Sequence, residues 1–215
     1  MSYKKYIAEF IGTFFLLLTI FMVAYSKVSA DLQPIAVGTM LIAMVYAVGH
    51  ISGAHFNPAV TLAFLLRGKI DIKNAGFYMG AQILGGIAAA LLASVLISAK
   101  PPIMPIVLPP QYFSMIPALL SELVGTFALT WVILNVATAK ALEGNAFYGI
   151  AIGLTLTALI YTLGSVSSSI FNPAAAIATC IVQFNAWNNL WIYLVGNLIG
   201  GALAALVFKY VGQDD

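Results

Sequence analysis

Six long apolar stretches constrain this chain more than any other feature of its sequence. Each has about the 20 residues that a helix needs to cross the hydrocarbon core of a bilayer. They cover residues 5–26, 33–51, 75–99, 114–138, 146–166 and 187–210. Charged residues make up only 7% of the chain, whereas soluble domains are about 25% charged. The sequence therefore predicts an all-α membrane protein with six transmembrane helices.

Two further apolar segments, 57–67 and 172–183, are too short to cross a bilayer, and each begins with Asn-Pro-Ala. Asn is a favoured N-cap residue and Pro is favoured at the first helical position, so each motif predicts a helix start. Apolar segments of this length are often re-entrant. We therefore expect two half-helices that enter the bilayer without crossing it.

The two halves of the chain resemble each other at an offset of 115 residues, or 113 near the start of each half. Matching residues include Gly38 and Gly153, Tyr78 and Tyr193, Gly85 and Gly200, and the Phe-Asn-Pro-Ala runs at 56–59 and 171–174. Each half contains three spans, so the second half must begin on the opposite side of the membrane. The sequence predicts a single channel domain built from two inverted repeats, residues 1–105 and 106–215, whose half-helices enter from opposite faces.

The positive charges predict the orientation in the membrane. With the N-terminus inside, seven of them face the cytoplasm: Lys4, Lys5, Arg67, Lys69, Lys73, Lys140 and Lys209. Only Lys27 and Lys100 face out. This distribution satisfies the positive-inside rule and places both termini in the cytoplasm of a cell-membrane protein. The Pro-rich stretch 101–117 then becomes an external connector, and a net charge of +2 gives no reason to expect a nucleic-acid partner.

The paired motifs predict a pore that excludes protons and ions. Each helix start carries about half a positive charge, and two such ends that face one point repel cations. The side chains of Asn57 and Asn172 can each cap a helix with their oxygen and donate an N–H to a water in the lumen. A water held this way cannot pass a proton onward. Pro58, Ala59, Pro173 and Ala174 complete the expected pore midplane.

The chain before each motif is a poor helix former and should supply backbone acceptors to the pore. Irregular backbone at membrane depth is tolerated where it lines a watery cavity. The carbonyls expected in this ladder belong to Gly53, Ala54, His55, Ser168, Ser169 and Ile170.

Glu9 and Glu122 are the acids that the sequence places deep in predicted spans. A charge at this depth is expensive and usually functional. Ion transport is one interpretation. Their symmetric positions favour another, in which each carboxylate accepts backbone N–H groups and anchors a re-entrant loop.

The run HISGAHFNPAVT at 50–61, the second FNPA at 171–174, and the AEF-GTF and SEL-GTF helix starts resemble the aquaporin, or major intrinsic protein, family. The resemblance covers the whole chain. It implies a right-handed bundle of six helices and two half-helices, one pore per subunit, and a homotetramer in lipid that passes water and small neutral solutes.

One position departs from the family pattern. Many members carry Arg three residues after the second Asn, where this chain has Ala175. The resemblance assigns Val37, Ile160 and Ser169 to the other positions of the outer selectivity filter. We expect a wide, apolar filter that passes ammonia, urea, hydrogen peroxide or dissolved gases besides water, with glycerol less favoured. Rejection of cations would then depend on the midplane dipoles.

Phe56 and Phe171 precede the two Asn residues. They are expected either to pack against neighbouring helices or to narrow the midplane in place of the missing Arg.

Other classes of protein fit less well. The sequence offers no nucleophile–base set, phosphate loop or metal-ligand cluster, so we expect neither an enzyme nor a cofactor or metal site. An ion-coupled secondary transporter is the alternative, because inverted repeats with broken helices are common there. The scarcity of ionisable groups in the spans argues against it. Cys180 is expected to be a packed residue of the second half-helix.

Overall fold

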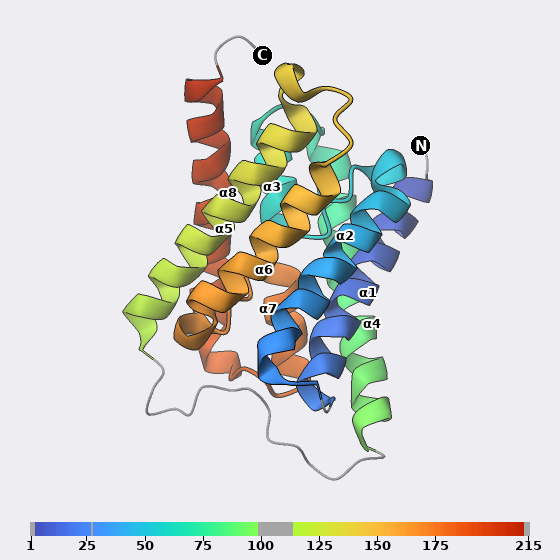
Figure 1. The fold of residues 1–215 in the computed structure, drawn as a ribbon, viewed down its shortest axis with the longest axis vertical. Coiled ribbons are helices and arrows are strands. Elements are labelled where there is room, and N and C mark those ends of the chain that lie inside the picture. Colours follow the sequence, from blue (N-terminus) through green and yellow to red (C-terminus); the bar gives the residue numbers. More distant parts are fainter. Residues whose placement is uncertain (1–2, 27, 99–113, 213–215) are drawn as a thin grey trace.

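The computed structural model describes residues 3–26, 28–98 and 114–212, and every regular element in these ranges is a helix (Figure 1). The long helices are α1 (Tyr3–Tyr25), α2 (Gln33–Ser52), α4 (Ile72–Ser98), α5 (Met115–Thr138), α6 (Tyr148–Ser167) and α8 (Leu190–Val211). The short ones are α3 (Pro58–Leu66) and α7 (Pro173–Ile181), with single 3-10 turns η1 (Ala30–Leu32), η3 (Lys140–Leu142) and η4 (Trp187–Asn189).

The six long helices are long and apolar enough to span a bilayer, which confirms the predicted all-α membrane fold. Large apolar side chains cover their outer faces, among them Leu84, Leu91, Val95, Leu120, Val124, Leu154 and Leu206. Contiguous apolar surface on this scale suits contact with lipid rather than water. The half-helices have 9 residues each. At about 1.5 Å per residue, neither can cross the hydrocarbon core.

Several sequence expectations fall outside the described residues. These are the boundary between 105 and 106, the outward-facing Lys27 and Lys100, and prolines 101, 102, 105, 109 and 110 of the expected connector. The end of that connector differs from expectation, because α5 begins at Met115 and so includes Pro117. Proline is tolerated there, since the N–H groups of a first helical turn have no intrahelical partner.

The packing of the helices repeats between the two halves. In the first half α1 packs along α4, and in the second α5 packs along α8. The helices α2 and α6, one from each half, cross at Gly38 and Gly153. A methyl group added to Gly38 would lie 2.6 Å from the carbonyl oxygen of Gly153, and the reverse distance is 2.5 Å. Glycine at both positions lets the backbones approach closely, as small residues commonly do between membrane helices.

The half-helices pack on the opposite half of the chain. Besides its neighbours in its own half, α3 packs along α8, and α7 packs along α4. The helix α1 begins, and α8 ends, at the same end of the bundle (Figure 1). The same view shows α3 toward that end and α7 toward the other, so the two short helices enter the bundle from opposite ends.

Candidate pore

The two Asn-Pro-Ala motifs start the half-helices as their local chemistry predicts. Asn57 is the N-cap of α3, and its Oδ1 accepts the backbone N–H of Ala59 at 2.8 Å. Asn172 is the N-cap of α7, and its Oδ1 accepts from Ala174 at 2.9 Å. In each case the following proline occupies the first helical turn, where its missing N–H costs nothing.

The two motifs also bond directly to each other. The Nδ2 of Asn57 donates to the carbonyl oxygen of Phe171 at 2.8 Å, and the Nδ2 of Asn172 donates to that of Phe56 at 2.9 Å. An amide NH₂ group has two N–H donors. No hydrogen bond within the described residues uses the second donor of either Asn, so each keeps one N–H for the lumen.

The chain that enters each motif has an unusual and repeated backbone. Gly53, Ala54 and Phe56 have φ of +88°, +52° and +50°. The equivalent residues Ser168, Ser169 and Phe171 have +71°, +49° and +48°. Non-glycine residues in this region of φ are uncommon, and each costs about 1–3 kcal/mol unless its surroundings hold it in place.

This backbone leaves a set of acceptors without partners. Within the described residues, no hydrogen bond uses the carbonyl oxygens of the expected ladder residues Gly53, Ala54, His55, Ser168, Ser169 and Ile170. Buried carbonyls usually have partners. Free carbonyls here can therefore accept bonds from molecules in the lumen.

Glu9 anchors the first of these loops. It is fully buried, and its Oε1 accepts from Ser52 Oγ at 2.6 Å and from the N–H of His55 at 3.0 Å. Its Oε2 accepts from the N–H of Phe56 and from Gln82 Nε2, each at 2.7 Å. The four bonds satisfy a buried carboxylate and hold Phe56, whose φ is positive, in place.

Glu122 anchors the second loop in the same way. Its Oε1 accepts from Ser167 Oγ at 2.7 Å and from the N–H of Ile170 at 3.0 Å. Its Oε2 accepts from the N–H of Phe171 at 2.7 Å. Both acids are thus occupied by loop contacts that match the anchoring interpretation.

Two tyrosines and two serines support the loops, a role that was not predicted from the sequence. The hydroxyl of Tyr78 donates to the carbonyl of Ser52 at 2.8 Å, and that of Tyr193 donates to the carbonyl of Ser167 at 3.1 Å. Each pair lies 115 residues from the other. The internal repeat could have indicated this role, because polar residues that recur at equivalent positions in both halves are candidates for a shared structural function.

The rings of Phe56 and Phe171 are fully buried and pack against glycines of the long helices. A methyl group added to Gly12 in α1 would lie 2.0 Å from Phe56 Cε1, and one added to Gly125 in α5 would lie 2.1 Å from Phe171 Cε1. These contacts favour the packing interpretation for both rings over the sieving one. Their carbonyls, not their rings, meet the two Asn side chains.

A narrow cavity of about 40 Å³ runs beside the two motifs. One water needs about 10–15 Å³ by this measure, so the cavity has room for a short file of waters. All four expected filter residues, Val37, Ile160, Ser169 and Ala175, line it. The helical side chains along it are aliphatic: Leu16, Leu17, Ile20, Leu41, Leu129, Ile133, Ile152 and Leu156.

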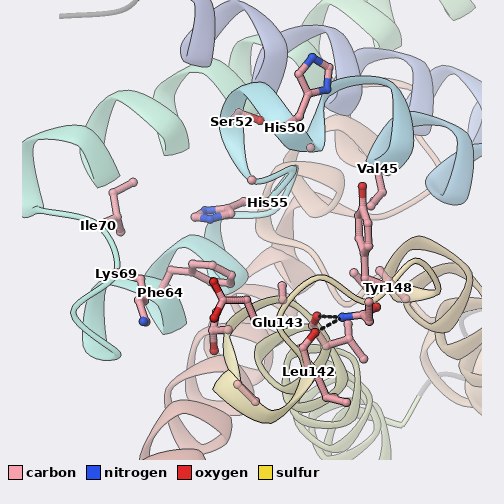
Figure 2. A pocket seen from close by; sticks show the side chains of 18 of the residues that line it. Val45, His50, Ser52, His55, Phe64, Lys69, Ile70, Leu142, Glu143 and Tyr148 are labelled. Atoms are coloured by element: carbon pink, nitrogen blue, oxygen red, sulfur yellow. Dashed lines mark hydrogen bonds between the residues drawn. The ribbon is translucent and has the colours of Figure 1, made fainter. Parts of the chain in front are cut away.

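A larger vestibule of about 1030 Å³ opens at the end of the bundle where α1 begins (Figure 2). Its walls include Lys5, Lys69 and Lys140 from three separate segments, so charges distant in sequence gather at one mouth. Asp71 also lines it, and hydrogen bonds from the backbone and side chain of Asn74 lower the pKa of its carboxyl.

The hydrogen bonds at the vestibule end of the pore differ between the two halves. His55 Nδ1 lies 3.1 Å from Thr61 Oγ1, which also accepts from Gln82 Nε2 at 2.9 Å. The equivalent positions in the second half hold Ile170, Ala176 and Asn197. The His55 ring projects into the vestibule and lies against Phe64 at 4.1 Å between ring centres (Figure 2). This polar cluster therefore belongs to one end of the pore.

Many known proteins resemble this chain in sequence or in fold. A probable aquaporin of the NIP type from Nicotiana alata is 36% identical, over 99% of this chain and 79% of its own. A glycerol uptake facilitator protein-like protein from Lactiplantibacillus plantarum is also 36% identical, over 99% of this chain and 100% of its own. The fold matches the aquaglyceroporin of Plasmodium falciparum with a TM-score of 0.83 at 22% identity, over 98% of this chain and 97% of that one. The family model described as major intrinsic protein matches residues 1–208. The chain therefore belongs to the major intrinsic protein family.

Proposed function

We propose that this chain is a passive channel for water and small uncharged solutes, and not an enzyme. The observation that carries the proposal is the meeting of two capped helix starts through reciprocal bonds, with one N–H of each Asn left for the lumen. Two positive helix ends at one point repel cations. Free carbonyls on one wall and aliphatic side chains on the other give polar molecules a path without a charged binding site.

The filter favours small neutral molecules besides water. Val37, Ile160, Ser169 and Ala175 provide no fixed charge and no large polar group. Ammonia, urea, hydrogen peroxide and dissolved gases fit such a filter, and glycerol is less favoured because no guanidinium orients its hydroxyls. The name of the Lactiplantibacillus relative includes glycerol uptake, so glycerol belongs in the test.

Stopped-flow measurements on proteoliposomes test this function. We expect fast water flux, measurable ammonia and urea flux, and a proton leak no higher than in empty liposomes. Ala175→Arg restores the usual family residue, and we expect it to lower urea flux while water flux continues. Strict water selectivity in the wild-type protein, or urea flux unchanged by Ala175→Arg, contradicts the proposed filter.

An ion-coupled transporter remains the second candidate, because its fold class also uses inverted repeats. Glu9 and Glu122 oppose it, since both carboxylates are engaged by loop donors. Solute flux that depends on an imposed sodium or proton gradient would favour the transporter. A passive channel gives the same permeability with and without the gradient.

The proposal also covers the orientation of the channel in the membrane and its oligomeric state. Lys5, Lys69 and Lys140 around one vestibule support a cytoplasmic position for that mouth, and so for both termini, in a cell membrane. A homotetramer follows from the family resemblance. Protease access to tags on the two termini in sealed cells tests the orientation, and the mass of the complex in native detergent tests the assembly.

A further inference from the structure

The internal repeat gives the outer filter a counterpart at the other end of the pore. The residues 115 positions from Val37, Ile160, Ser169 and Ala175 are Ile152, Val45, Ala54 and Val60. The two sets lie on the same helices, since α2 carries Val37 and Val45 and α6 carries Ile152 and Ile160. Eight residues of helix separate the members on each helix, which is about 12 Å.

Two cavities meet at this second level. The narrow cavity and the vestibule share two lining residues, His55 and Ile152. Val45 lines the vestibule, and Ala54 and Val60 line the narrow cavity. The wide space of about 1030 Å³ thus gives way to the one of about 40 Å³ where these residues lie.

The inner set is bulkier and less polar than the outer one. At each level α2 contributes a valine and α6 an isoleucine, so these two positions have the same total side-chain volume at both levels. The difference lies in the other two positions, where Val60 replaces Ala175 and Ala54 replaces Ser169. Val60 and Ala175 both line the narrow cavity and are both almost fully buried, so the difference between the two positions is the greater bulk of valine.

We infer that Val45, Ala54, Val60 and Ile152 form an inner ring that sets the upper size limit for solutes of this channel. The inference rests on the proposed channel function and adds a second selectivity site, on the vestibule side of the two Asn residues. All four side chains are aliphatic, so the ring forms an aliphatic collar around the pore. A molecule with few polar groups, such as ammonia or water, crosses it at lower cost than urea or glycerol, because each polar group must shed water there.

The imidazole of His55 adds one polar feature beside the collar. Its Nδ1 is engaged with Thr61, whereas no hydrogen bond within the described residues uses its Nε2. The ring nitrogen can therefore exchange one hydrogen bond with a molecule that enters from the vestibule. A single side-chain partner suits a small solute better than a polyol.

Reciprocal variants separate the two levels. Val60→Ala gives the inner ring the residue found at the outer filter, and Ala175→Val does the reverse. We expect Val60→Ala to raise urea permeability about tenfold, because it removes two methyl groups from the narrow wall that urea must pass. Ala175→Val should lower it by no more than about twofold, because the substitution raises the minor outer barrier only to the height of the dominant inner one, and the resistances of barriers in series add.

A milder matched pair controls for folding. Ile152→Val and Ile160→Val remove the same methylene from α6 at the inner and outer levels, a change that folded cores tolerate. The inner variant should raise urea permeability relative to water by more than the outer variant does. A larger effect from Ile160→Val or Ala175→Val than from the inner variants overturns the inner ring. Wild-type protein without water flux overturns the proposed function instead.

Discussion

Replacing Glu122 by Gln should loosen the second re-entrant loop without unfolding the bundle. The carboxylate accepts the N–H groups of Ile170 and Phe171 through different oxygens, at 3.0 and 2.7 Å. Glutamine keeps the size of the side chain and converts one of these oxygens to an NH₂ group, which cannot accept a bond. In either amide orientation, one backbone N–H therefore loses its acceptor.

The magnitude follows from the kind of bond that is lost. A hydrogen bond to a charged group contributes about 1.5–3 kcal/mol, and a buried donor without a partner costs about 1–3 kcal/mol. These terms overlap, so we expect the loop to be destabilised by about 2–4 kcal/mol. Ser169 and Phe171 hold positive φ values of +49° and +48° against their preference, so the loop has a ready route to relax.

Hydrogen exchange of the loop in nanodiscs measures this effect. A cost of about 2–4 kcal/mol corresponds to roughly 30- to 1000-fold faster exchange at the amides of Ile170 and Phe171, since 1.4 kcal/mol is a factor of ten. Water permeability should fall with it. Asp31→Asn changes an exposed acid that lines neither cavity, and it is the control that should leave both readouts unchanged. Wild-type exchange at Ile170 and Phe171 in Glu122→Gln would show that the anchoring argument is wrong.

Three smaller predictions concern a packed ring, a helix start and a thiol. Gly12→Ala should destabilise the protein by about 1–3 kcal/mol, because the new methyl group overlaps the ring of Phe56, and a lower midpoint of thermal denaturation in detergent measures it. Hydrogen bonds from Asn74 hold the pKa of Asp71 below its ordinary value. The Asp71 carboxylate should therefore support the first turn of α4 at neutral pH, and this support should be lost as pH falls through the lowered pKa. Amide exchange in that turn across about pH 2–5 measures the loss, and Asp71→Asn should remove the pH dependence. Cys180 is buried in α7, so a mercurial should leave water permeability unchanged, and inhibition that Cys180→Ala abolishes would contradict this.

Local chemistry explains what the sequence predicted well. An Asn-Pro pair starts a helix through bonds within three residues, so the starts of α3 and α7 could be placed before any contact was known. The anchoring role of Glu9 followed from its match with Glu122. These inferences needed no knowledge of which helices are neighbours.

Tertiary contacts decide what the sequence left open. Nothing near Phe56 in the chain indicates that its ring packs against Gly12, because the contact joins residues more than forty positions apart. The bond from Tyr78 to Ser52 has the same origin. The inner polar cluster of His55 and Thr61 was harder still, since the repeat itself predicts a symmetry that these residues break.

The exchange of half-helices between the repeats bears on how the protein is made. The helix α3 packs along α8, and α8 leaves the ribosome after the other five long helices described here. Domains generally fold from the N-terminus during synthesis, yet here the first re-entrant segment must wait until α8 has been made. Until then its irregular backbone lacks one protein wall, and hydrocarbon cannot bond to it. A chain truncated before α8 should therefore insert its early spans but expose this segment to quality control.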